Sequence, residues 1–293
     1  MPGFDVLDVW LLSLIFLKIL LYTSSLLACG SMLFIVMVRP EDSELEQRLL
    51  SVAMIFALIG LVTTGVQTVL QSGQLLDEGI SGIFDGYMLV ILLQGPLGAS
   101  SFARGLGLVL LIITVIIPSL RILLIPLGAI YVALSFGLIG HATKNPNLLG
   151  PLITVHILAI SYWIGGLLPL HRLARRPETM KIAAHLAITF GRQAMIIIPF
   201  LIASGLIVAY CLLESLQALY GTSYGRLLIA KIIAVSLLLA LGAMNKLYWV
   251  PRLMNGDSKA AETLRASIRW EAFAFLIIFA ITATLTSALH LPE

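Results

Sequence analysis

Charged residues are scarce in this sequence: they make up 11% of its 293 residues, against 59% that are hydrophobic. A soluble domain needs polar groups facing water on all sides, and this chain has too few of them. Apolar runs close to the ~20 residues that cross a bilayer recur along its whole length instead. They do not alternate as the ~10-residue strands of a membrane barrel would. The sequence therefore predicts an all-α, polytopic membrane protein.

Cysteine is also scarce, because the chain has only Cys29 and Cys211, and they lie in different apolar runs. Without a Cys-x-x-Cys pair, neither a disulfide framework nor a thiolate metal site is expected. The sequences Gly-x-Ser-x-Gly, His-Glu-x-x-His and the Walker motif are missing, as is any Met-x-x-Met cluster. We therefore predict that the protein is not an enzyme and has no methionine ladder for Cu(I).

Polar segments divide the chain into eight predicted spans. They cover residues 9–38, 49–71, 99–119, 121–142, 150–171, 187–213, 224–248 and 268–289. One more apolar segment, "GIFDGYMLVILLQG" at 82–95, is too short and too interrupted by glycine to cross. It is predicted to be a short helix that lies in the membrane interface or dips back into it.

The distribution of basic residues predicts the orientation. Thirteen of the 18 Lys and Arg residues fall in or near the loops after the first, third, fifth and seventh spans, and three fall on the opposite side. By the positive-inside rule, both termini are expected to face the periplasm. The most basic loop, "HRLARRPETMK" at 171–181, either carries this topology signal alone or also attracts anionic lipid.

The two halves of the chain resemble one another. In the third span of each half, a glycine precedes a basic residue by six positions. The first spans of the two halves can be aligned so that a glycine in one matches a glycine in the other. The matched positions are Gly98 and Arg104 with Gly225 and Lys231, and Gly30 with Gly165. We predict one membrane domain over residues 1–293, built from a four-helix repeat in the same orientation, with halves at about 9–142 and 150–289.

Several motifs resemble those of one family. They are "GHA" at 140–142, "HILAISYWIGGLLPL" at 156–170, "YGRLLIAKIIAVSLLLALGAMNKLYWVPRL" at 224–253 and "RWEAFAFLIIFAITATLT" at 269–286. This pattern resembles the CopD/PcoD copper-resistance membrane proteins. The resemblance implies copper handling in the bacterial inner membrane, with import from periplasm to cytoplasm. It also implies a small periplasmic partner of the CopC type, beside copper and the bilayer. No nucleic-acid partner is predicted.

Three histidines belong to the predicted periplasmic half: His141 ends the fourth span, His156 lies about two turns into the fifth, and His290 closes the eighth. His156 and Trp163, seven residues apart, share one helix face, next to glycines that let a neighbour approach closely. An ionisable ring at this depth is either a neutral core residue, bonded to a carbonyl or polar side chain, or a ligand.

Copper suits these residues, because imidazole binds Cu(I) and Cu(II), and a thioether adds preference for Cu(I). The predicted metal ligands are His156, His141 and His290, with Met88 on the outer short segment as a further candidate. Members of the family often carry a histidine in the first span, nine residues before its glycine. Leu21 stands at that position here. One asymmetric site is therefore predicted.

Two other functions remain open at this point. A helical bundle with paired histidines can hold b-type haem and carry electrons. Alternatively, the protein is a receptor for a periplasmic copper protein and conducts nothing. Several charged residues lie within the spans and need partners, among them Arg104, Lys231 and Glu271. Arg104 and Lys231 either extend outward to the interface or pair with a carboxylate. Glu271 is expected to pair with Arg269 or Lys246, or else to form an exit-side metal or proton site.

Overall fold

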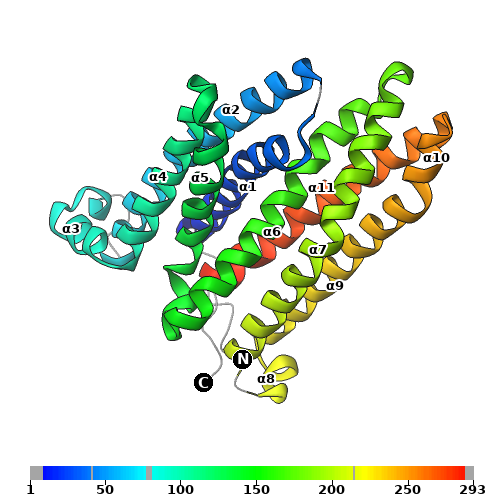
Figure 1. The fold of residues 1–293 in the computed structure, drawn as a ribbon. Helices are drawn as coiled ribbons and strands as arrows, with labels where there is room; N and C mark the ends of the chain where they lie inside the picture. Colours follow the sequence, from blue (N-terminus) through cyan, green and yellow to red (C-terminus); the bar gives the residue numbers. More distant parts are fainter. Residues whose placement is uncertain (1–8, 41, 77–80, 214, 288–293) are drawn as a thin grey trace.

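The computed structural model describes residues 9–40, 42–76, 81–213 and 215–287 (Figure 1). These residues form helices joined by short turns, and no strand occurs among them. Eight of the helical segments are long and apolar enough to cross a membrane. The prediction of an all-α bundle with eight spans is therefore confirmed.

The first four spans are α1, α2, α4 and α5. Their bounds are α1 Val9–Val38, α2 Ser43–Leu76, α4 Pro96–Ile116 and α5 Arg121–Gly137, the last preceded by the short 3-10 helix η2 Pro118–Leu120. Between α2 and α4 lie η1 Ser81–Phe84 and α3 Gly86–Gln94. The Asp85 side chain caps α3 by accepting a hydrogen bond from the Met88 amide at 2.7 Å. A short helix is thus present where residues 82–95 predicted one.

The last four spans are α6, α7, α9 with its extension, and α11. Their bounds are α6 Pro146–Leu173, α7 Met180–Leu212, α9 Ser223–Met244 continued by η5 Asn245–Trp249 and α10 Val250–Met254, and α11 Ser258–Ser287. The connecting elements are η3 Gly140–Lys144, η4 Pro177–Thr179 and α8 Leu216–Gly221. The segment η5 is a π-helical turn, which widens the helix locally. It places an irregular turn in the seventh span.

Two glycines let α1 and α6 cross in direct backbone contact. A Cβ atom added to Gly30 would lie 2.1 Å from the Ser161 carbonyl oxygen, and one added to Gly165 would lie 2.1 Å from the Gly30 carbonyl oxygen. No side chain fits there. Small residues at such crossings allow the close van der Waals packing that holds membrane helices together.

The helix contacts around this crossing correspond in pairs. Under the predicted repeat, α1 matches α6 and α5 matches α11. The helix α1 packs on both α6 and α11, and α6 packs on both α1 and α5. The aligned glycines Gly30 and Gly165 meet each other, as equivalent residues on a two-fold axis would. The second and third spans of each half also pack on each other: α2 on α4, and α7 on η5 and α10, the extension of α9. Superposition of the halves remains the test of the repeat.

The start of α1 and the end of α11 lie at the same end of the bundle, which we call the outer end because it is predicted to be periplasmic. Lys18 Nζ donates to the Thr286 carbonyl oxygen at 2.8 Å, and the Tyr22 hydroxyl is 3.2 Å from Thr286 Oγ1. At the opposite, inner end, Arg121 forms an ion pair with Glu46 and joins the start of α5 to α2.

Candidate metal centre

His156 lies ten residues after the first residue of α6, about 15 Å along the axis at 1.5 Å per residue. This is deeper than the two turns expected from the sequence, because α6 begins at Pro146, four residues before the predicted span. The ring crosses to α7, where Nδ1 is 3.0 Å from the Leu201 carbonyl oxygen and 3.2 Å from Ser204 Oγ. The ring therefore points into the bundle, as predicted.

The partner of Nδ1 determines which ring nitrogen carries the proton. A carbonyl oxygen can only accept a hydrogen bond, so Nδ1 donates to Leu201 and carries the hydrogen. In the neutral ring Nε2 then holds the lone pair, and it has no hydrogen-bond partner among the described residues. A metal-binding histidine usually has this arrangement, with its second nitrogen held by a carbonyl or carboxylate.

Glycine at position 205 makes room for this ring. A Cβ atom added to Gly205 would lie 2.9 Å from His156 Cε1 and 3.3 Å from Nδ1. The hydroxyl of the preceding Ser204 donates to the Phe200 carbonyl oxygen at 2.7 Å, so it can accept from the ring.

The structure places the other predicted ligands as follows. The backbone of His141 lies in η3 at the outer end, just before α6. His290 lies outside the described residues. Met88 is half-buried on α3, which packs on α2 and α4 at the edge of the bundle, whereas His156 faces α7 (Figure 1). Met88 and His156 are thus not brought together, and the four-residue site remains a prediction.

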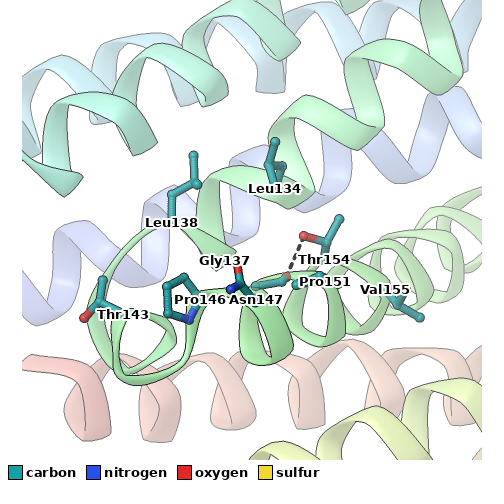
Figure 2. Close-up of a pocket in the computed structure, with 10 residues that line it drawn as sticks. Leu134, Gly137, Leu138, Thr143, Pro146, Asn147, Pro151, Thr154 and Val155 are labelled. Carbon is teal, nitrogen blue, oxygen red and sulfur yellow. Dashed lines mark hydrogen bonds between the residues drawn. The ribbon is translucent and has the colours of Figure 1, made fainter.

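An open hollow of about 580 Å³ lies where α5, η3 and α6 meet at the outer end. Figure 2 shows Leu134 of α5, and Leu138 directly after α5, facing Pro146 and Pro151 of α6 across it. Its lining is mostly apolar, and Thr143 of η3 is one of the few polar side chains at its rim. Val155 lines the hollow, but the neighbouring His156 points the other way, toward α7.

A second polar group lies deeper, around Glu271 of α11. Trp163 Nε1 donates to Glu271 Oε2 at 2.9 Å, and Asn245 Nδ2 donates to Glu271 Oε1 at 2.5 Å. The expected pairing of Glu271 with Arg269 or Lys246 is wrong: Arg269 is exposed, and Lys246 Nζ donates to the Gly191 carbonyl oxygen. Residues 163, 245 and 271 all lie in the family motifs, and the charge of Glu271 within a predicted span was a further signal in the sequence.

Arg104 follows neither of its predicted alternatives. Its side chain is buried, with 4% of the residue exposed. It donates to Ser135 Oγ at 3.2 Å and Ser100 Oγ at 3.1 Å, and it lies 5.0 Å from the centre of the Phe136 ring. Hydroxyl groups and an aromatic face thus take the place of the expected carboxylate.

The crossing glycines, the anchored histidine and the buried carboxylate define a multi-pass helical membrane protein with a polar interior, an arrangement typical of proteins that move ions. Comparison with known proteins is consistent with this class. Residues 6–151 match the family model "Copper resistance protein D-like, N-terminal domain", and residues 184–285 match "Copper resistance protein D". The chain therefore belongs to the CopD family of copper-resistance inner-membrane proteins, and the predicted family is confirmed.

One curated relative matches over nearly its whole length. The chain is 26% identical to the "Inner membrane protein YebZ" of Escherichia coli (strain K12) over 285 residues, which is 92% of this chain and 96% of the relative. No solved structure matches the chain.

Proposed function

We propose that this protein takes copper from the periplasm and passes it through the bundle toward the cytoplasm. Membership of the copper resistance family supports the cargo. The observation that carries the proposal is the His156 ring, whose Nδ1 is held by the Leu201 carbonyl oxygen so that Nε2 is available to a metal ion. Copper is the cargo here, bound and released in turn.

The surroundings of His156 favour weak, reversible binding. No group of three or more His, Cys, Asp or Glu residues suited to a metal ion occurs among the residues that the structure describes. A transported ion has to leave its site, so a site with few ligands suits passage better than storage. His141 and His290 are the residues proposed to complete the site from the outer end.

Metal analysis of the purified protein tests this function against its alternatives. After incubation with copper and removal of the excess, we expect about one copper ion per chain and no haem absorption. A strong Soret band with stoichiometric haem would instead identify a b-type electron carrier, and would overturn the copper proposal. If this protein retains a CopC-type periplasmic protein but binds no copper itself, the result would favour the alternative function, a receptor that conducts nothing.

Both chain termini are proposed to face the periplasm. The support is the excess of Lys and Arg in the loops at the inner end of the bundle. A C-terminal reporter that is active only in the cytoplasm should give no signal, while the same reporter inserted after Arg176, in the basic loop before η4, should be active. Activity at the C-terminus would reverse the orientation and, with it, the proposed direction of copper movement.

A further inference from the structure

Glu271 is a carboxylate buried in the spanning part of the bundle. It is the fourteenth residue of the 30-residue α11, so it lies near the middle of that helix, and 3% of the residue is exposed. Both carboxylate oxygens accept a hydrogen bond, from Trp163 on α6 and from Asn245 on η5. Both donors are neutral. A carboxylate is costly at this depth unless a cation or a proton neutralises it.

No cation neutralises Glu271 among the described residues. The ion pairs there join Glu44 with Arg48 and Glu46 with Arg121 at the inner end. The titratable or charged groups on the elements around α11 are Lys18, Tyr22 and Cys29 on α1; His156, Tyr162, His171 and Arg172 on α6; Tyr224, Arg226 and Lys231 on α9; Lys246 and Tyr248 on η5; and Arg252 on α10. Lys18 and Tyr22 contact Thr286, fifteen residues along α11, and Lys246 donates to Gly191. None of these groups bonds to the carboxylate.

The amide of Asn245 offers a further acceptor beside this carboxylate. Its Nδ2 contacts Glu271, while its Oδ1 is buried and has no hydrogen-bond partner among the described residues. Asn245 is itself only 8% exposed. It begins the π-helical turn η5, and such turns are frequent at functional sites. Rotation of the amide would present Oδ1 as an acceptor to a protonated carboxyl, so Asn245 can bond with both forms of Glu271.

We propose that Glu271, held between Trp163 and Asn245, is a proton-binding site within the membrane-spanning bundle. A proton binds to one carboxylate oxygen and later leaves from it, and no other bond forms or breaks. A metal ion fits poorly, because the site offers one carboxylate and one amide oxygen, whereas copper prefers nitrogen and sulfur ligands and hard cations need more oxygens. Coupling of ion movement to protons would need such a group.

Two further buried polar atoms lie between Glu271 and the inner end. Ser267 Oγ is one helical turn from Glu271 along α11, and His171 Nε2 is about two turns from Trp163 along α6. Neither atom has a hydrogen-bond partner among the described residues. A proton that approached Glu271 from the inner end would pass these atoms.

Infrared spectroscopy of the purified full-length protein at neutral pH tests this site without copper. We expect the wild type to show a C=O stretching band from one protonated carboxyl, reversibly lost as the pH is raised. Glu271→Gln, which keeps the shape and the hydrogen-bond acceptor, should lack this band completely. Glu262→Gln is the matched control, because Glu262 is an exposed carboxylate on the same helix, and it should keep the band.

The proposal is overturned if the wild type and a folded Glu271→Gln protein have the same spectrum in this region. If Glu271→Gln does not fold, as judged by its helical circular dichroism, Trp163→Phe decides. That variant removes one donor to the carboxyl and should shift the band, and an unshifted band overturns the proposal as well. Because no copper is added, the result does not depend on whether the copper proposal is correct.

Discussion

Gly165→Ala is expected to prevent a stable fold. Alanine stabilises an ordinary helix relative to glycine by up to ~1 kcal/mol, so helix propensity alone predicts a gain. Here the added Cβ atom would lie 2.1 Å from the Gly30 carbonyl oxygen and 2.2 Å from its carbonyl carbon. Backbone atoms cannot move aside as the end of a side chain can. We expect a loss of ~3 kcal/mol or more, at the upper end of overpacking effects.

Size-exclusion chromatography and thermal unfolding in detergent measure this effect. Gly65→Ala is the matched control, because Gly65 lies in the spanning helix α2 and nothing is within 4 Å of an added Cβ. The control should elute and unfold like the wild type, or be slightly more stable. If Gly165→Ala is as stable as Gly65→Ala, the close crossing of α1 and α6 does not exist in the protein.

His156→Ala is expected to lose most copper binding. The substitution removes Nε2, the nitrogen left free when Nδ1 donates to Leu201. We expect copper affinity to fall at least tenfold, which corresponds to ~1.4 kcal/mol or more. Equilibrium titration of the purified variant with a copper chelator competitor measures the change.

His185→Ala is the control for this variant. His185 is an exposed histidine near the start of α7, at the inner end of the bundle. This control shows whether the loss of copper binding is specific to position 156 or follows the removal of any histidine. Equal losses in the two variants, or no loss in His156→Ala, would return His156 to the role of a core histidine satisfied by Leu201 and Ser204.

The spans could be predicted from the sequence because hydrophobicity marks the stretch that lipid surrounds. The first predicted span and α1 have the same bounds, 9–38. The second, predicted at 49–71, is part of the longer α2 Ser43–Leu76, because polar residues such as Glu44 and Gln47 continue the helix beyond the apolar segment. Hydrophobicity therefore locates the part in the membrane, while capping and turns determine where the helix ends.

The inward direction of His156 followed from its place in an apolar run, but its full depth and its partners did not. Leu201 and Ser204 are 45 and 48 residues away, and only helix packing brings them to the ring. The same holds for Glu271, for which Arg269 and Lys246 were expected as partners because they are opposite in charge and lie at the same predicted end of the spans. In the folded bundle the buried carboxylate instead accepts hydrogen bonds from Trp163, 108 residues away, and from the amide of Asn245.

The central claim is that Nε2 of His156 binds copper, and X-ray absorption of the copper-loaded protein tests it most directly. The wild type is compared with His156→Met, which replaces the imidazole by a thioether that also binds Cu(I). We predict imidazole scattering around copper in the wild type, and a sulfur neighbour in place of one imidazole in the variant. Identical copper environments in the two proteins would contradict the account.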